Sequence, residues 1–176
     1  MNIWHDIDPK RITPKSFEAL IEIPKGSKTK YELDKETGIL KIDRVLYTST
    51  VYPSNYGFIP RTYADDGDPL DVLVLCNEAI YPMTLVNCYP IGVIKMVDSG
   101  AMDEKIIAIP FADPTYNSFQ DLMDLPGHIF DEMAHFFTVY ESLEGKEAVA
   151  GDVNDRAAAI RVIERAIEHY VECYCK

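Results

Sequence analysis

The chain reads Asp66-Gly67-Asp68-Pro69-Leu70-Asp71-Val72-Leu73-Val74-Leu75-Cys76, a loop with three carboxylates that runs directly into an apolar segment. Asp, Gly and Pro favour turns, so the first residues alone describe a solvated loop. The apolar run after Asp71 is typical of a buried strand. A carboxylate at the mouth of such a strand is unfavourable unless it is paired, and acids this close repel one another unless a cation lies between them. The stretch therefore predicts a metal site at the start of a core strand.

Two other carboxylate motifs fit this stretch less well. An EF-hand loop beginning at Asp66 needs glycine at its sixth position and glutamate at its twelfth. This chain has Asp71 and Asn77 at those positions. Phosphatases of the haloacid dehalogenase type carry Asp-x-Asp after a buried strand, whereas here the cluster precedes one. A polar turn remains the simplest alternative to a metal site.

Strand patterns dominate the first two thirds of the chain. Residues 34–38, which end in Gly38, predict a hairpin loop between two short strands. No helical pattern separates the strands, which favours a small antiparallel barrel over a βαβ fold. We expect strands over residues 17–23, 30–33, 39–42, 45–51, 71–76, 85–97 and 105–109.

The last third of the chain changes to helical spacing. Residues 129–143 lack proline and place apolar side chains at helical intervals. Asn154 or Asp155 can cap a second helix, whose apolar face includes Ile163 and Ile167. No repeat or linker interrupts the chain. We therefore expect a single domain over 1–176, mainly β, with flanking α-helices packed outside the barrel.

The charge balance narrows the range of partners. The chain has 29 acidic and 17 basic residues and a formal net charge of −12. Nucleic-acid binders gain most of their affinity from Lys and Arg, so this composition argues against such a partner, while carboxylates suit hard divalent cations. No apolar run is long enough for a membrane span, and no signal peptide is visible. We expect a cytoplasmic enzyme or binding protein with no nucleic-acid or membrane partner.

A second group of acids follows the strand pattern at 93–97. Asp98 and Asp103 flank a predicted turn that would bring both carboxylates beside the first cluster, although this segment alone is equally a charged loop. Carboxylates for metals, with Lys, Arg and Tyr for anionic oxygens, are the groups that metal-assisted phosphoryl transfer needs. Basic and phenolic residues lie where other strands should end, namely Lys30, Arg44, Tyr52, Tyr56 and Tyr140.

The first cluster, through Val72, resembles the signature of the bacterial type of family I soluble inorganic pyrophosphatases. The resemblance covers the chain from about Trp4 to Tyr140, and the ordered set of motifs is far more specific than the signature alone. The further matches, in the family's order, are Ile21-Glu22-Ile23-Pro24, Lys30-Tyr31-Glu32, Asp43-Arg44, Tyr52-Pro53-x-Asn55-Tyr56-Gly57, Gly92-Val93-x-Lys95-Met96-x-Asp98 and His135-Phe136-Phe137-x-x-Tyr140.

This resemblance implies a five-stranded OB-like closed barrel and a cytoplasmic homo-oligomer, usually a hexamer. It also implies Mg²⁺-dependent hydrolysis of pyrophosphate to two orthophosphates, with several ions in each active site. By this resemblance Asp68 orients and deprotonates the attacking water, and Glu22 and Glu32 support the metal site. The residues that correspond to Mg²⁺ ligands are Asp66, Asp71, Asp98 and Asp103. Those that correspond to phosphate contacts are Lys30, Arg44, Tyr56, Lys105 and Tyr140.

Two positions depart from the family pattern. Ser99 stands where an acid commonly follows the aspartate that matches Asp98. Glu141 stands where a lysine that contacts phosphate commonly follows the tyrosine that matches Tyr140. Because a carboxylate repels phosphate, either Glu141 faces solvent or another base such as Lys146 reaches the site.

Two other functions are compatible with the sequence. An OB-like binding module without catalysis would need a basic face with exposed aromatic residues, and the net negative charge argues against it. A regulatory homologue that binds metal and phosphate but turns over poorly would carry the same motifs. Glu141 is the residue that keeps this second alternative open.

Overall fold

The computed structural model describes residues 1–176 and is built around a ring of five strands. In the ring β7 pairs with β2, so the sheet closes on itself. This closure confirms the predicted mainly β fold with a small five-stranded OB-like barrel. The strands pair in the order β2 (Ser16–Ile23), β5 (Asn55–Ile59), β6 (Leu70–Val74), β8 (Ala101–Pro110) and β7 (Thr84–Asp98).

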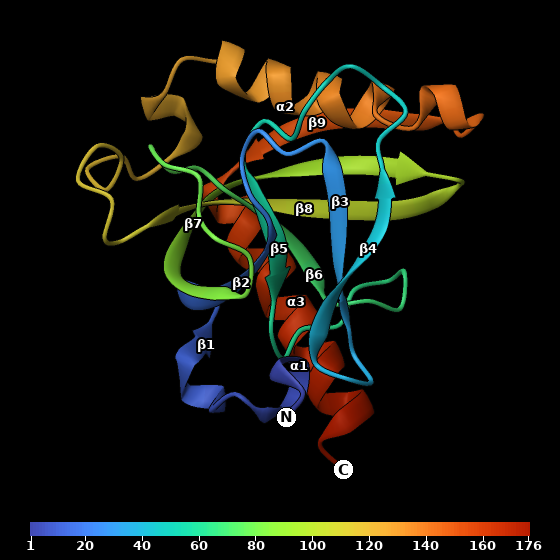
Figure 1. Ribbon diagram of the computed structural model, residues 1–176. Coiled ribbons are helices and arrows are strands. Elements are labelled where there is room, and N and C mark those ends of the chain that lie inside the picture. The colour runs from blue at the N-terminus through green and yellow to red at the C-terminus, as the bar shows by residue number, and fades with distance from the viewer.

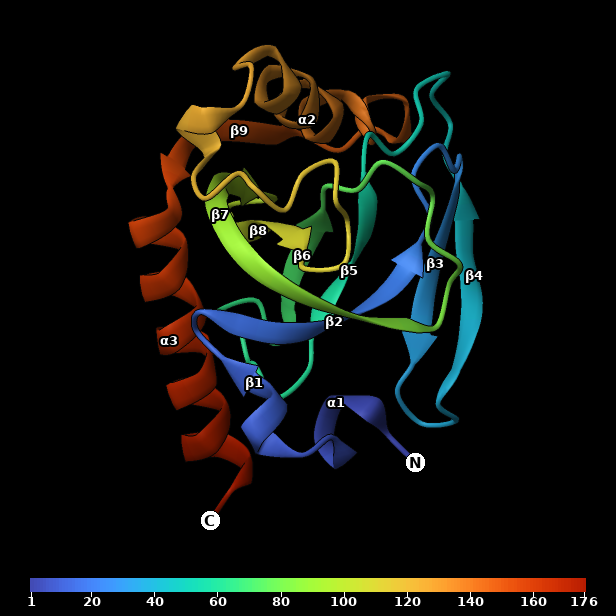
Figure 2. The same cartoon turned by 90° about the vertical axis from the view of Figure 1, so that its left-hand side faces the viewer.

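Helices, a hairpin and two edge strands surround this ring (Figures 1 and 2). The helix α2 lies across one end of the barrel, α3 runs along its side, and α1 lies at the opposite end near both termini. Strands β3 and β4 form a separate two-stranded sheet, while β1 pairs with β2 and β9 pairs with β7. These elements are α1 (Ile3–Asp6), β1 (Ile12–Thr13), β3 (Thr29–Asp34), β4 (Ile39–Val45), α2 (His128–Val139), β9 (Ala148–Asp155) and α3 (Arg156–Tyr174). Short 3₁₀ turns cover Pro9–Arg11, Leu122–Asp124 and Ser142–Glu144.

Strand β6 is buried on both of its faces, which explains its continuous apolar run. Successive strand residues point to opposite faces, so Leu70, Val72 and Val74 join the core cluster that includes residues of α3. Leu73 belongs to the cluster that packs on α2. Each such side chain, fully buried, contributes about 1.5–3 kcal/mol. Asp71 lies on the same face of β6 as Leu73 and therefore toward the α2 side.

One strand pair differs from the antiparallel barrel that the sequence predicts. Strands β6 and β8 are parallel, because β7 first runs back along the sheet and a tight hairpin then returns the chain in the direction of β6. In this register Asp71 lies opposite Lys105. The parallel pairing therefore sets a carboxylate near the start of β6 beside a lysine in the middle of β8.

Three strands, β1, β5 and β9, were not predicted, and one predicted strand is partly loop. Strand β1 has only two residues, and β5 and β9 each contain a glycine, which lowers strand propensity. The glycines are required by close backbone approach, because a Cβ at Gly57 would lie 1.8 Å from the Leu20 carbonyl oxygen and one at Gly151 would lie 2.7 Å from that of Lys95. The strand expected over 45–51 is wrong beyond residue 45.

The loop after residue 45 is held by other backbone partners. The Leu46 N–H donates to the Lys28 carbonyl at 2.9 Å, and the Tyr52 N–H donates to that of Ser27 at 3.0 Å.

In the last third of the chain, the helix expected over 129–143 ends at Val139. The predicted cap of the second helix is confirmed for Asp155, whose side chain accepts from the Ala158 N–H at 3.0 Å.

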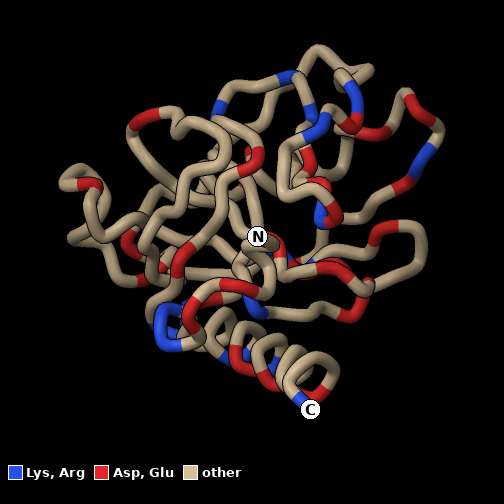
Figure 3. The backbone as a smooth tube through the Cα atoms, turned by 60° about the horizontal axis from the view of Figure 1, so that its bottom comes forward, with Lys and Arg blue, Asp and Glu red and all other residues tan.

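Charged residues are spread along the whole chain, with Lys and Arg between the more numerous acids (Figure 3). None of the helices combines the length and the apolar character that a membrane-spanning helix needs.

Candidate active site

The predicted site residues meet in one cavity of about 280 Å³, bounded by the barrel, the β3–β4 hairpin and the C-terminal end of α2. Its wall includes Asp68 and the supporting acids Glu22 and Glu32. Every predicted site residue except Arg44 lines this cavity. The others are the predicted metal ligands Asp66, Asp71, Asp98 and Asp103, and the predicted phosphate contacts Lys30, Tyr56, Lys105 and Tyr140.

The loop before β6 is a tight turn that presents its aspartates to the cavity. The Ala64 N–H donates to the Asp68 carbonyl at 2.8 Å, and the Gly67 N–H donates to the Ala64 carbonyl at 3.1 Å. Gly67 has a φ of 86°, a conformation that favours glycine. Asp66 Oδ1 accepts from the Asp68 N–H at 3.1 Å. The backbone is thus the polar turn that composition suggests, while its carboxylates belong to the wall of a site.

The β7–β8 hairpin brings the second pair of aspartates to the first, as the sequence predicts. Asp98 pairs with Ala101 across a two-residue turn in which Ser99 and Gly100 have φ values of 50° and 82°. Two successive positive φ values are typical of a type I′ turn, which matches the twist of the strands. The Ser99 hydroxyl donates to Asp98 Oδ1 at 3.1 Å, so this departure from the family pattern orients the predicted ligand.

Lys105 is the buried centre of the cavity wall, with an exposed fraction of 2 %. Its Nζ donates to the Tyr56 hydroxyl at 2.9 Å and to Asp71 Oδ2 at 3.0 Å, and lies 3.1 Å from Asp103 Oδ2. Burial opposes the charged form, but these carboxylates and the phenol together raise the pKa of Lys105 well above its usual value. The lysine is therefore a fixed positive charge between two predicted metal ligands.

Several carboxyl groups of the cavity have raised pKa values. Desolvation raises the pKa of Asp66 to about 6, although the hydrogen bond from the Asp68 N–H opposes it. Desolvation also raises the pKa of Asp71, against the effect of the Lys105 ammonium. Burial raises the pKa of Glu22 to about 8, despite a hydrogen bond from the Leu33 N–H at 2.7 Å. Burial is thus the main factor that opposes the charged form of these three carboxyl groups.

The donor set fits hard divalent cations. No three His, Cys, Asp or Glu side chains stand close enough together to enclose a metal ion, because the aspartates are spread over the wall and Lys105 holds two of them. The ligands on offer are all carboxylate oxygens, which Mg²⁺ and similar ions prefer. Desolvation, with a smaller effect of neighbouring aspartates, raises the pKa of Asp66 and Asp71, and a bound cation would favour their charged forms.

Arg44 and Glu141 are bound to each other at the edge of the cavity. The Glu141 side chain is 6 % exposed, which contradicts the first of the two alternatives, that it faces solvent. Its Oε1 lies 2.5 Å from Arg44 Nη2 and 3.8 Å from Lys146 Nζ. Asp43 and Glu144 also form ion pairs with Arg44. Arg44 is thus paired with three acids. Lys146 lines a neighbouring cavity, together with Asp98 and Asp103.

Lys35 is a cavity residue that sequence reasoning missed. Its Nζ lies 2.5 Å from Asp68 Oδ1, and it lines the same cavity. It belongs to the loop of the β3–β4 hairpin, where the sequence indicates only a turn. The only feature of the sequence that points to Lys35 is that Lys30 and Glu32, both predicted site residues, lie in the same hairpin.

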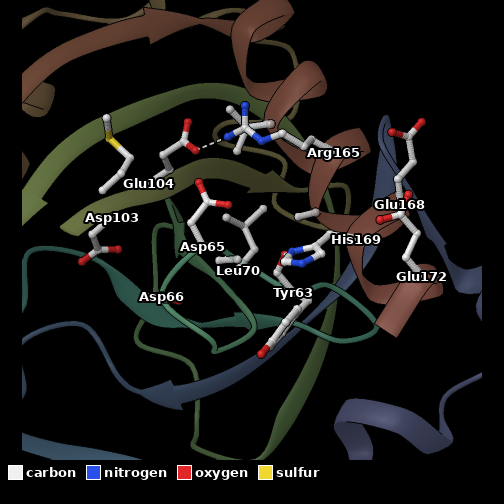
Figure 4. Close-up of a pocket in the computed structure, with 14 residues that line it drawn as sticks. Tyr63, Asp65, Asp66, Leu70, Asp103, Glu104, Arg165, Glu168, His169 and Glu172 are labelled. Atoms are coloured by element: carbon white, nitrogen blue, oxygen red, sulfur yellow. Dashed lines mark hydrogen bonds and ion pairs between the residues drawn. The ribbon is translucent and has the colours of Figure 1, made fainter. Parts of the chain in front are cut away.

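A second cavity of about 300 Å³ lies between the loop at residues 63–66, β8 and α3 (Figure 4). It shares Asp66 and Asp103 with the first cavity. Arg165 reaches from α3 to an ion pair with Glu104, and His169 Nδ1 lies 3.2 Å from the Tyr63 carbonyl oxygen. None of the predicted phosphate contacts lines this cavity. The first cavity is therefore the candidate active site.

Comparison with known proteins relates the whole chain to one group. A family model described as inorganic pyrophosphatase matches residues 19–171. Among similar relatives, soluble inorganic pyrophosphatase 2 of Chlamydomonas reinhardtii is 47% identical over 171 residues, covering 97% of this chain and 89% of that protein.

Solved structures agree with this relationship. The inorganic pyrophosphatase of Thermus thermophilus superposes with a TM-score of 0.92 at 36% identity, covering 97% of this chain and 99% of that chain. That of Helicobacter pylori superposes with a TM-score of 0.86 at 44% identity, covering 89% and 94%. The similarity thus extends over the barrel, the hairpin and the loops that carry the site.

Proposed function

This chain belongs to the inorganic pyrophosphatase family and hydrolyses inorganic pyrophosphate to two orthophosphates, and we propose that the cavity beside Asp66–Asp71 is its active site. The observation that supports this assignment is the meeting of the predicted metal ligands, the predicted base and four predicted phosphate contacts in that one cavity. The elements that supply them are far apart in the chain. Such convergence in one cavity is typical of an active site.

The enzyme is metal-dependent, and we propose Mg²⁺ as the ion and Asp66, Asp71, Asp98 and Asp103 as its ligands. Several ions are expected in each site, with Glu22 and Glu32 in support. When bound, divalent cations lower the pKa of water and offset the charge of the phosphates. The all-carboxylate donor set and the raised pKa values of Asp66 and Asp71 support this proposal.

Asp68 is proposed to take the proton of the attacking water. The water oxygen forms a bond to one phosphorus as the bond from that phosphorus to the bridging oxygen breaks. The leaving phosphate keeps the electron pair of the broken bond, and Asp68 holds the proton that the water loses. The position of Asp68 between two proposed metal ligands in the loop supports this role.

Lys30, Lys105, Tyr56, Tyr140 and Arg44 are proposed to hold the phosphates. The two lysines supply positive charge, and burial raises the pKa of both tyrosines, so they remain neutral and can donate their hydroxyl hydrogens to phosphate oxygens. Both lysines also have acidic partners, but Arg44 has three, Asp43, Glu141 and Glu144, and does not line the cavity, so it must exchange at least one of them for phosphate before it can act.

We also propose that the enzyme is a cytoplasmic homohexamer of single-domain subunits that span residues 1–176. The family resemblance supports the hexamer and the compartment. The net charge of −12 supports the absence of a nucleic-acid partner.

Phosphate release from pyrophosphate, measured with and without Mg²⁺, tests this function. We expect rapid release with Mg²⁺, none after chelation of divalent cations, and recovery when Mg²⁺ is added back. An organic phosphate ester is the control substrate and is expected to react far more slowly. Binding of Mg²⁺ and phosphate without release, under any divalent cation, would favour the regulatory homologue instead.

A further inference from the structure

Lys35 lies between the loop that carries Asp68, here called the catalytic loop, and the N-terminal segment that contains Asn2 and Trp4. Its Nζ is 2.5 Å from Asp68 Oδ1 on one side. On the other side the same atom is 5.1 Å from the centroid of the Trp4 ring, which is within the range of a cation–π interaction. The ammonium is therefore held in place from two directions by residues that are far apart in the sequence.

The N-terminal segment also fixes the backbone of Lys35. The Asn2 side-chain amide donates to the Lys35 carbonyl at 3.0 Å, and its oxygen accepts from the Trp4 N–H at 3.1 Å, which caps α1. The hairpin loop approaches so closely that a Cβ at Gly38 would lie 2.7 Å from the Met1 carbonyl oxygen. Both views show α1 beside the loop end of the β3–β4 hairpin (Figures 1 and 2).

Trp4 connects this support to the catalytic loop itself. Trp4 is 7 % exposed, and its Nε1 donates to the Thr62 carbonyl at 2.9 Å. The Thr62 hydroxyl oxygen accepts from the Leu70 N–H at 2.9 Å, and Leu70 lies between Asp68 and Asp71. Trp4 thus contacts Lys35 of the hairpin and is linked through Thr62 to the loop that carries Asp68.

We propose that Lys35 is a positioning residue, held by Asn2 and Trp4, that fixes the Asp68 carboxylate where it takes the proton of the attacking water. This inference rests on the role proposed above for Asp68. The side chains of Lys35 and Asp68 are 30% and 61% exposed, and ion pairs this accessible contribute little to stability. The main effect of this ion pair is therefore to orient the Asp68 carboxylate.

Lys35→Met tests the proposal, with Lys41→Met as the matched control on the same hairpin. Lys41 is 56% exposed, pairs with Asp34 at 3.8 Å and does not line the cavity. We expect Lys35→Met to lower kcat about ten- to a hundredfold with KM changed by less than about threefold, since small misplacement of a catalytic group costs this much. The midpoint of thermal unfolding should stay close to that of the control. Lys35→Arg keeps the positive charge and should recover most of the lost kcat.

A double-mutant cycle with Asp68→Asn separates positioning from other roles. If Lys35 acts through Asp68, Lys35→Met has little further effect once the carboxylate is gone. An equal fall in kcat in both backgrounds, or a raised KM at unchanged kcat, would overturn the proposal. An inactive wild-type protein would instead refute the proposed function, so the two failures are distinguishable.

Asn2→Ala tests the support from the N-terminal segment without disturbing the core. The substitution removes the hydrogen bond to the Lys35 carbonyl and the cap of α1. We expect a smaller fall in kcat than for Lys35→Met, and no further fall when both substitutions are combined. Independent, multiplying effects of the two substitutions would contradict the proposed support.

Discussion

Asp68→Asn is expected to lower kcat for pyrophosphate hydrolysis by about 10²–10⁴ and to leave the fold intact, because the amide keeps the shape of the side chain but cannot take a proton. The side chain is 61% exposed, so its replacement disturbs no packing. Steady-state phosphate release at saturating Mg²⁺ and pyrophosphate measures the loss. Thermal unfolding measured on the same samples shows whether the fold is retained.

Asp65→Asn is the matched control for this prediction. Asp65 precedes the cluster in the same loop but lines the second cavity, not the candidate active site. It should keep kcat close to that of the wild type. If Asp68→Asn did the same, proton removal would have to be assigned to another group.

Lys105→Met is expected to destabilise the protein by roughly 3–5 kcal/mol in the absence of divalent cations, since it removes one partner of a buried charge cluster. The substitution leaves Asp71 and Asp103 facing each other without the ammonium that lies 3.0 Å and 3.1 Å from their carboxylates. Activity should fall as well, because Lys105 is a proposed phosphate contact. Urea denaturation in a chelating buffer measures the stability.

Added Mg²⁺ should restore more stability to Lys105→Met than to the wild type, because an ion bound only by the folded state stabilises that state and here replaces a lost charge. Lys41→Met, at an exposed ion pair, should change stability by less than about 0.5 kcal/mol. Equal stability of Lys105→Met and the wild type in chelator would show that the cluster does not depend on this lysine.

The fold could be predicted where a local pattern carries the information. The apolar run of β6 and the helical spacing of α2 and α3 are such patterns, and these elements are present in the structure. The strands β5 and β9 could not be predicted, because their glycines weaken the local signal and serve close contacts with distant strands. The parallel pairing of β6 with β8 depends on the path of β7, which no local pattern describes.

The candidate site could likewise be predicted only where a local pattern carries the information. The aspartates are recognisable because their spacing in the loop and in the β7–β8 hairpin is itself the motif. The environment of Arg44 could not be predicted, because its partners Glu141 and Glu144 lie 97 and 100 residues away in the sequence. Lys35 was missed for the same reason, since its contacts with Asp68 and Trp4 exist only in the folded chain.

The structure explains how the chain accommodates a glutamate at position 141, which the sequence does not. A carboxylate at this position in the motif suggests repulsion of phosphate, whereas the structure shows a buried acid paired with Arg44. The negative charge is thus compensated within the protein. A glutamate in place of the family's common lysine therefore affects the ion pairs of Arg44 more directly than it affects the charge that faces the cavity.

Locating the bound metal tests most directly whether Asp66, Asp71, Asp98 and Asp103 bind the metal while Asp68 takes the proton. Mn²⁺ accepts the same oxygen ligands as Mg²⁺, and its anomalous scattering identifies it in crystals grown with this ion. We predict peaks in the cavity of about 280 Å³, coordinated by carboxylates among Asp66, Asp71, Asp98 and Asp103, with Asp68 left free of metal. Ions bound only outside this cavity, or an ion coordinated by Asp68, would contradict these roles.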